Sequence, residues 1–296
     1  MEIKEVKKCP VCGQNEFSLK FYCEDYFVSH EKFPIYVCQS CLFNFTQHVP
    51  GKDSISQYYK ADNYISHSDT KKGLVNKIYH TVRKVMLSKK ANILKKYHTT
   101  GALLDIGCGT GYFAHEMSLR GWNVVGVEPS VVASSLAKAK FGLDVKDSLF
   151  ASDFHEKQFD LITLWHVLEH FDELDNTLST IATLLKNTGT IAVALPNAVS
   201  YDAKKYKAHW AAYDVPRHNW HFSPKTFEKL IAQYGLYIKK IYPMPFDAFY
   251  IAMLSEKYKK NSIHQLRGIL TGMKSFFICL GNKNKSSSLI YIIKKV

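Results

Sequence analysis

Three glycines at alternate positions form the most informative segment of this chain: Gly107, Gly109 and Gly111. Asp105 precedes them at the end of an apolar run. Glycine has no Cβ and tolerates positive φ, so such a turn lets the backbone approach a ligand closely. The helix-forming stretch that follows offers free N–H groups and the positive end of its dipole. A dinucleotide-binding loop reads G-x-G-x-x-G, and Tyr112 stands where its third glycine would be. A triphosphate-binding loop has a Lys-Ser/Thr pair after its last glycine, and that pair is absent here. The run predicts a loop for another ligand, or a plain tight turn.

A carboxylate follows the glycine loop, at the end of the next predicted strand. Glu128 comes 17 residues after Gly111, at the end of an apolar segment that reads as the next strand. In α/β nucleoside-binding folds, a carboxylate at the end of the second strand accepts hydrogen bonds from the ribose hydroxyls. The alternative is a solvated acid at a strand end. With the glycine loop before it, we interpret Glu128 as a ribose contact.

The glycine run, the Glu128 segment and the apolar segments 159–170 and 189–197 together resemble the class I S-adenosylmethionine-dependent methyltransferases, over about residues 99–246. The resemblance implies an α/β fold with a Rossmann-like, doubly wound sheet of seven strands, the last one antiparallel. It implies S-adenosylmethionine as the cofactor and S-adenosylhomocysteine as its product. The cofactor contacts that it implies are Asp105, Gly107, Cys108, Gly109, Gly111, Glu128, Pro129, Asp147, Ser148 and Trp165.

The exit of the predicted fourth strand carries groups that can act on a methyl acceptor. His166, Glu169 and His170 are spaced i, i+3, i+4, which is one face if the segment is helical. A histidine titrates near neutrality and can remove a proton. An E-x-x-E-H run binds a divalent metal in some ubiquinone-pathway and small-RNA methyltransferases, but His166 replaces its first glutamate. Structural packing, a base or substrate contact, and a metal site all remain open for this segment.

A second acceptor-side candidate is the loop 210–223, which combines a scarce arginine, two histidines and two tryptophans. Ser223 as N-cap and Pro224 at the first helical position predict a helix after it. The Pro-Arg-His pattern resembles the substrate-facing segment of small-molecule class I methyltransferases. Arg217 suits an anionic acceptor group, although it equally fits an arginine that bonds loop carbonyls. We expect His166 or His218 as the base and Arg217 as the residue that orients the acceptor.

Two C-x-x-C pairs, separated by 25 residues, predict a Cys₄ zinc site. The ligands are expected to be Cys9, Cys12, Cys38 and Cys41, on a zinc ribbon with a long hairpin, and Cys23 is expected not to bind. Zinc of this kind is structural and folds a segment that is too small for its own core. The segment 1–50 resembles the zinc-binding region ahead of sugar C-methyltransferases, where glycine often stands in place of Leu42. A zinc module also precedes some ribosomal-RNA methyltransferases.

The elements that position these residues divide the chain into three parts. After the zinc ribbon, 51–98 reads as a helical connector or lid, with Tyr58, Tyr59 and Tyr64 in its first part and a helical apolar pattern from 74. The part 99–296 reads as the methyltransferase domain, with strands at 236–242 and 288–293 that pair antiparallel. A helical insertion lies between these strands, at about 247–285.

The insertion carries an apolar stripe at helical spacing over 263–280, with lysines on both flanks. A basic amphipathic helix can lie on an anionic membrane. The more common arrangement is a lid that packs its stripe on the protein, and this is the arrangement that we expect.

Composition narrows the remaining choices. The chain has 296 residues, 46% of them hydrophobic, and a formal net charge of +13. The charged start and the absence of a long apolar run indicate a cytoplasmic protein, in which seven cysteines favour metal over disulfides. The excess charge is nearly all lysine and is scattered in pairs, which favours a solvated surface over a nucleic-acid track.

We therefore expect a methyltransferase for a small-molecule acceptor, with a sugar nucleotide or cell-envelope precursor first and a quinone-type phenol next. The alternatives are an RNA methyltransferase and a non-catalytic cofactor-binding scaffold. The sequence does not indicate the oligomeric state.

Overall fold

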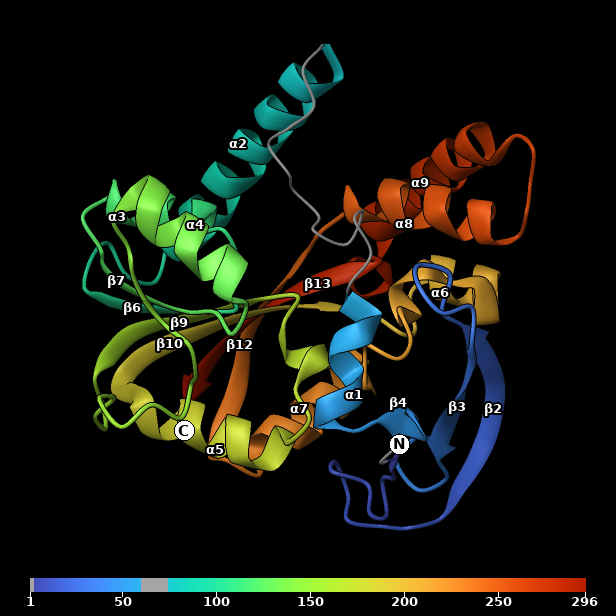
Figure 1. Cartoon of the computed structure of the whole chain (residues 1–296), viewed down its shortest axis with the longest axis horizontal. Helices are drawn as coiled ribbons and strands as arrows, with labels where there is room; N and C mark the ends of the chain where they lie inside the picture. The colour runs from blue at the N-terminus through green and yellow to red at the C-terminus, as the bar shows by residue number, and fades with distance from the viewer. Residues whose placement is uncertain (1–2, 60–73) are drawn as a thin grey trace.

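The structure, a computed structural model, describes residues 3–59 and 74–296 (Figure 1). At its centre is a seven-stranded sheet with the order β12-β13-β10-β9-β6-β7-β8. In this order the strands are Leu236–Pro243, Ser288–Lys295, Leu185–Pro196, Phe159–Trp165, Ala102–Ile106, Asn123–Val127 and Asp144–Lys146. Only β13 runs antiparallel to its neighbours, β10 and β12. The predicted doubly wound sheet with an antiparallel last strand is confirmed.

Helices cover both faces of this sheet, α2, α3 and α4 on one and α5 and α7 on the other (Figure 1). Their bounds are Leu74–Leu94 (α2), Tyr112–Ser118 (α3), Val131–Phe141 (α4), Leu174–Leu184 (α5) and Pro224–Ala232 (α7). Successive strand residues point to opposite faces, so Leu103 packs toward α2 and α3 while Leu104 packs toward α5. The part of the predicted connector that contains Tyr64 lies outside the described residues.

The cysteine-bearing region forms a second, four-stranded antiparallel sheet with the order β11-β4-β3-β2. Its strands are Trp220–His221 (β11), Asn44–Thr46 (β4), Lys32–Cys38 (β3) and Phe17–Glu24 (β2). The hairpin β2–β3 is the long hairpin that the cysteine spacing predicts. Strand β11 comes from the loop 210–223 and pairs Trp220 with Phe45, so this loop completes the sheet of the first fifty residues. Nearby lie β1 (Ile3–Lys4), β5 (Val49–Pro50) and α1 (Lys52–Ile55).

The loop 210–223 is anchored at its far end by the start of α7. Ser223 Oγ accepts a hydrogen bond from Thr226 N, and the Thr226 hydroxyl accepts one from Ser223 N, which is a capping box. Gly235 takes φ +67° just after the helix. The predicted helix start is confirmed.

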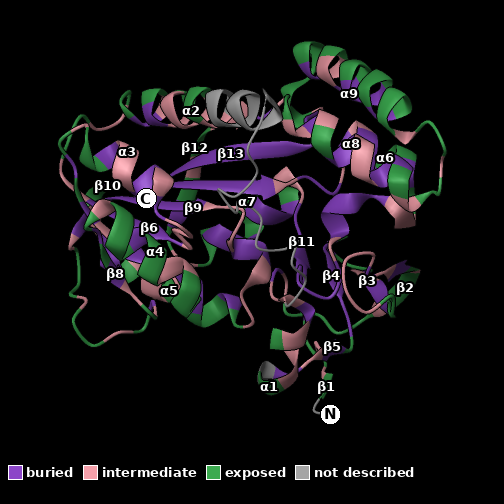
Figure 2. Cartoon of the chain, turned by 45° about the horizontal axis from the view of Figure 1, so that its top comes forward, coloured by how far each residue is buried: buried purple, intermediate pink, exposed green. Residues whose placement is uncertain are grey.

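The insertion before β13 is a pair of helices, α8 (Asp247–Tyr258) and α9 (His264–Gly281), which pack against each other (Figure 2). The remaining short elements are α6 (Tyr201–Tyr206) and the 3₁₀ helices Ser56–Tyr59, Leu168–His170, Lys207–His209, Ala211–Tyr213 and Lys283–Lys285. The expected lid arrangement is wrong, because the apolar stripe of α9 points away from the protein. Its exposed members are Ile263, Leu266, Ile269, Leu270, Met273, Phe277 and Leu280.

Candidate active site and four-cysteine cluster

The glycine loop connects β6 to α3 with all three glycines at positive φ: +68° at Gly107, +56° at Gly109 and +81° at Gly111. A Cβ on Gly107 would lie 2.4 Å from a methyl group of Val167, and one on Gly111 would lie 2.8 Å from the Cβ of Ala137. These two glycines are therefore required by packing. A Cβ on Gly109 would meet no described heavy atom within 4 Å. The tip of the loop thus presents open backbone in a conformation that favours glycine.

Glu128 is held directly against this tip. Gly109 N donates to one carboxylate oxygen at 2.9 Å, and Ser130 N donates to the other at 2.9 Å. The ends of β6 and β7 meet here because the two strands are parallel neighbours in the sheet. The structure thus brings together the loop and the carboxylate that the sequence singles out.

Other predicted cofactor contacts surround this point. Pro129 and Asp147 are exposed, and Ser148 is half-buried and accepts a hydrogen bond from Phe150 N. The Cys108 thiol packs inward against Gly126, and burial raises its pKa. These residues leave the outer side of the loop lined by small and polar groups.

Asp105 and Trp165 lie deeper, beside a lysine that the sequence did not single out. Asp105 is 1% exposed; one carboxylate oxygen accepts from the Thr163 hydroxyl at 2.6 Å, and the other has no hydrogen-bond partner among the described residues. Burial raises the pKa of Asp105 to about 7. Lys90, from α2, lies 4.2 Å from the centroid of the Trp165 ring, and burial lowers its pKa to about 8. Nothing in the local sequence marks Lys90, because α2 reaches this site only through the fold.

His166 lies between two carboxylates. Its Nδ1 is 3.5 Å from Glu169 and its Nε2 is 3.4 Å from Asp247, the first residue of α8. Burial alone lowers the pKa of His166, but the two carboxylates outweigh it and raise the pKa to about 9. His166 is therefore a cation at neutral pH. Asp247 was not predicted as a site residue, because it is distant in sequence.

Glu169, the carboxylate partner of His166, also forms a cluster with His170 and His218, and the ligand atoms of these three residues all lie within 4.8 Å of one another. Glu169 is fully buried, and neither of its carboxylate oxygens has a hydrogen-bond partner among the described residues. The Nδ1 atoms of His170 and His218 lie 3.1 and 2.9 Å from the backbone carbonyls of Arg217 and Ala212. Each carbonyl fixes an Nδ1–H tautomer, which leaves Nε2 as an acceptor. Burial, reinforced by His218, lowers the pKa of His170 to about 4.

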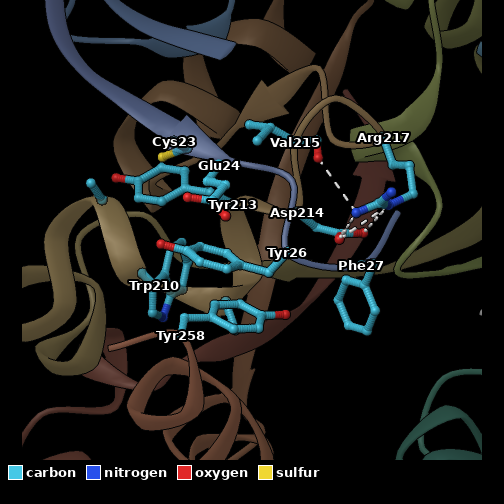
Figure 3. A pocket seen from close by; sticks show the side chains of 12 residues that line it. Cys23, Glu24, Tyr26, Phe27, Trp210, Tyr213, Asp214, Val215, Arg217 and Tyr258 are labelled. Atoms are coloured by element: carbon cyan, nitrogen blue, oxygen red, sulfur yellow. Dashed lines mark hydrogen bonds and ion pairs between the residues drawn. The ribbon is translucent and has the colours of Figure 1, made fainter. Parts of the chain in front are cut away.

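Arg217 is 1% exposed and has carboxylates on two sides. Its guanidinium donates to Asp214 at 2.7 Å, to Asp25 at 2.8 Å and to the carbonyl of Tyr58 at 2.8 Å. The adjoining cavity measures about 10 Å³ and has stacked rings of Tyr26 and Tyr258 on one side (Figure 3). That is room for about one water molecule. The sequence leaves two roles open for Arg217, binding an anionic acceptor group or holding its loop in place. The hydrogen bonds that Arg217 makes in this structure are those of an arginine that holds a loop.

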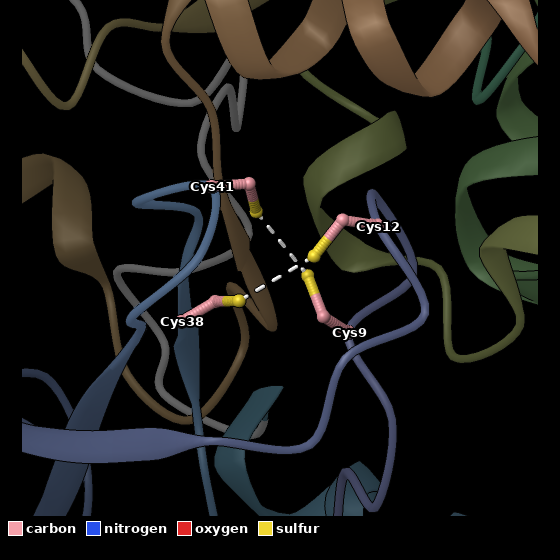
Figure 4. Close-up of side chains that lie close together, drawn as sticks. All are labelled: Cys9, Cys12, Cys38 and Cys41. Atoms are coloured by element: carbon pink, nitrogen blue, oxygen red, sulfur yellow. Dashed lines mark hydrogen bonds between the residues drawn. The ribbon is translucent and has the colours of Figure 1, made fainter.

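The four predicted zinc ligands meet at one point, with their sulfur atoms turned toward one another (Figure 4). The Sγ atoms of Cys9 and Cys41 are 3.5 Å apart, as are those of Cys12 and Cys38. Sulfurs of a tetrahedral Zn–S₄ site are separated by a similar distance, since each bond is about 2.3 Å. The donor set and its spacing therefore fit zinc. Cys23 lies elsewhere, buried beside Phe33 and Tyr58.

Comparison with known proteins agrees with this arrangement. Residues 78–241 match a family described as "Methyltransferase domain". The ubiquinone biosynthesis O-methyltransferase of Rhodopseudomonas palustris (strain TIE-1) is 29% identical over 133 residues, which cover 40% of this chain and 50% of that protein. The chain thus spans about half the length of this relative.

Solved structures show the same fold at lower identity. Geranyl diphosphate C-methyltransferase from Streptomyces coelicolor A3(2) aligns with a TM-score of 0.52 and 15% identity, over 78% of this chain and 87% of that one. A SAM-dependent methyltransferase from Archaeoglobus fulgidus aligns with a TM-score of 0.50 and 21% identity, over 72% and 94%. The chain belongs to the methyltransferase-domain family and carries a class I S-adenosylmethionine-dependent methyltransferase domain.

Proposed function

We propose that this protein transfers a methyl group from S-adenosylmethionine to a small-molecule acceptor. The observation that carries the proposal is the contact between Gly109 and Glu128, which joins an open glycine loop to a strand-end carboxylate. Bound S-adenosylmethionine would supply an electrophilic methyl group on its sulfonium. The protein then has to hold donor and acceptor in line and, for an oxygen or carbon acceptor, remove a proton.

The proposed cofactor site fits the residues present. The loop from Gly107 to Gly111 would receive the amino-acid part of the cofactor, and Glu128 would accept from the ribose hydroxyls. Asp147 and Ser148 would contact the adenine side, with Cys108 and Pro129 alongside. The unpartnered oxygen of Asp105 offers a buried acceptor to the same ligand, and Trp165 offers an aromatic wall.

On the acceptor side, we assign the proton-accepting role to His218. Its Nδ1 faces a backbone carbonyl, so Nε2 can take a proton, and Glu169 nearby would stabilise the resulting imidazolium. His166 is already charged at neutral pH, so we assign it the role of positioning Glu169. Arg217 would position the loop that carries His218, because Asp25 and Asp214 already bind its guanidinium.

The Glu169, His170 and His218 cluster also offers two ring nitrogens and a carboxylate, which are donors that suit a divalent cation. Chelation distinguishes the two roles. If His218 acts as a base, transfer continues after a chelation step that leaves only the zinc of the four cysteines bound. Loss of transfer under those conditions, restored by added Mg²⁺, would replace the base with a metal site.

The acceptor class follows from two considerations. The relative compared above is named for ubiquinone biosynthesis, the making of a small molecule. The burial of Arg217 removes the main reason for requiring an anionic acceptor group. A quinone-type phenol therefore stands beside a sugar nucleotide or cell-envelope precursor, and a panel of both classes with radiolabelled cofactor decides between them. Salt-sensitive methylation of RNA, with none of either panel, would favour the RNA alternative.

Calorimetry with S-adenosylhomocysteine tests the cofactor site. Removing hydrogen bonds to a charged group costs about 1.5–3 kcal/mol, so Glu128→Ala should weaken binding by about tenfold or more. Glu173→Ala, which changes an exposed glutamate without a cap bond, serves as the matched control. Equal affinity in all three proteins would end the proposal for this site.

A further inference from the structure

Helix α9 buries its small residues and exposes its large apolar ones. The residues of α9 that are buried are Gly268, Thr271, Gly272, Ser275 and Cys279. A Cβ on Gly268 would lie 2.5 Å from the Cα of Met253, and one on Gly272 would lie 2.8 Å from the Cα of Phe249. The backbones of α8 and α9 therefore approach closely because these two positions carry no Cβ.

The opposite face of α9 is a continuous apolar surface. Its members recur at helical spacing, so they lie on one side. Leu266, Leu270 and Phe277 are 57%, 57% and 63% exposed, and Leu280 is 68% exposed. Figure 2 shows the outer side of α9 as exposed, at the margin of the molecule and away from the central sheet. A contiguous exposed apolar surface that is bordered by polar residues marks an interaction site.

The charge around this face selects its partner. The sequence from 257 to 285, which includes α9 and its flanks, contains seven Lys and Arg residues and no Asp or Glu. Lys257, Lys259 and Lys260 are exposed at one end of α9, and Lys283 is exposed just beyond the other. Arg267 is exposed one residue beyond Leu266, at the edge of the apolar face, where a long basic side chain can reach phosphate while its stem stays in an apolar layer. A second copy would bring these cations together, whereas an anionic bilayer complements both the charge and the apolar face.

We propose that α9 is an interfacial helix that docks the protein on an anionic lipid bilayer, with its apolar face at the boundary of headgroups and acyl chains. Among the described residues, no helix is long and apolar enough to cross a bilayer. The helix would therefore lie in the plane of the surface, with its apolar side chains buried by about 5–10 Å. This inference does not depend on the methyl acceptor.

Co-sedimentation with phospholipid vesicles tests the docking. We expect the full chain to bind vesicles of phosphatidylcholine mixed with phosphatidylglycerol, and to bind pure phosphatidylcholine more weakly. The triple variant Leu266→Ser, Leu270→Ser, Phe277→Ser should bind at least about tenfold more weakly, because burial of apolar area supplies most of the affinity. These side chains are exposed, so the variant should retain the melting temperature of the wild type.

A matched control keeps the test specific. Leu119, Val131 and Leu136 are also exposed, at 71%, 77% and 49%, but belong to the α3–α4 region. Their replacement by serine should leave vesicle binding unchanged. Equal binding by both triple variants would overturn the proposal. A dimer in light scattering that the α9 variant dissociates, without vesicle binding by the wild type, would overturn it in favour of a second copy.

Discussion

Asp25 and Arg217 are 192 residues apart in sequence and 2.8 Å apart in space, both fully buried. Asp25 begins the turn between β2 and β3, and its carboxylate also accepts hydrogen bonds from the backbone of Phe27 and Ser29. Arg217 lies in the loop next to His218. One ion pair thus ties the cysteine-bearing sheet to the proposed acceptor loop.

Replacing Asp25 with Asn should destabilise the whole chain. Breaking a buried pair leaves a charge without its partner, which costs about 3–5 kcal/mol; the second carboxylate, Asp214, places the expected loss at the lower end of that range. Asp153→Asn breaks an exposed pair with Lys146 and should leave the denaturation midpoint unchanged. Urea unfolding of the three proteins measures this, and coincident curves would show that the buried pair contributes nothing.

The same pair predicts sensitivity to acid. Burial alone raises the pKa of Asp25, but hydrogen bonds from Arg217 and Ser29 outweigh it and hold the pKa below its ordinary value. A lowered pKa contributes stability that is present above the unfolded value, about 3.9, and is lost as pH falls through the folded one. Below about pH 3.9, the stability of the wild type should therefore fall more steeply with decreasing pH than the stability of Asp25→Asn. Parallel profiles for the two proteins would contradict the assignment.

His166 predicts that the protein also loses stability as pH rises, the opposite direction to the loss expected from Asp25. Its folded pKa of about 9 exceeds the ordinary 6.5, so its contribution is complete below pH 6.5 and is lost as pH rises through 9. Because a third of its side chain is exposed, we expect a loss on the order of 1–2 kcal/mol over that window. His166→Gln should flatten the profile, and His155→Gln, on the surface, should not. A wild-type profile that is already flat there would contradict the shift.

The cysteine cluster predicts a single structural zinc. Mass spectrometry under native conditions should find one zinc in the wild type and in Cys23→Ser, and none in Cys38→Ser. Chelation should lower the melting temperature of the wild type, because the free energy of metal binding is part of the free energy of folding. Retention of zinc by Cys38→Ser would remove Cys38 from the ligand set.

Leu42 predicts a gain in stability. It follows the second C-x-x-C pair at φ +63°, as Gly13 follows the first at φ +73°. A left-handed conformation costs an L-residue about 1–2 kcal/mol, and glycine at this position would not incur that cost. Part of the resulting gain in stability is lost because glycine has more conformational entropy in the unfolded chain. Leu42→Gly should therefore stabilise the protein by about 0.5–1 kcal/mol. Leu119 is similarly exposed but has φ −61°, so Leu119→Gly should not stabilise the protein. A loss of stability in both variants would show that Leu42 is not strained.

The sequence predicts those parts of the fold whose causes are local. The three alternate glycines mark the loop, Ser223 and Pro224 mark a helix start, and apolar runs mark the strands. The cysteine pairs predict a hairpin because the turns formed by the two C-x-x-C pairs must meet at one metal ion. In each case neighbouring residues contain the physical reason.

The remaining features depend on contacts between distant segments. Asp25, Lys90 and Asp247 reach their partners through β2, α2 and α8, and no pattern near them marks these contacts. Helical periodicity shows that α9 has an apolar face but not which way it points. The glycines of α9, 268 and 272, are the signal that was missed, because only their face allows a close approach to α8.

Strand β11 has a consequence for how the first fifty residues can be studied. Trp220 and His221 hydrogen-bond to β4 and follow His218 closely, so deleting the N-terminal segment would also leave the edge of this loop unpaired. A truncated enzyme that fails to methylate would therefore say nothing about whether the deleted segment recognises the acceptor. Point substitutions at the metal ligands, with cofactor affinity measured alongside, separate the two contributions.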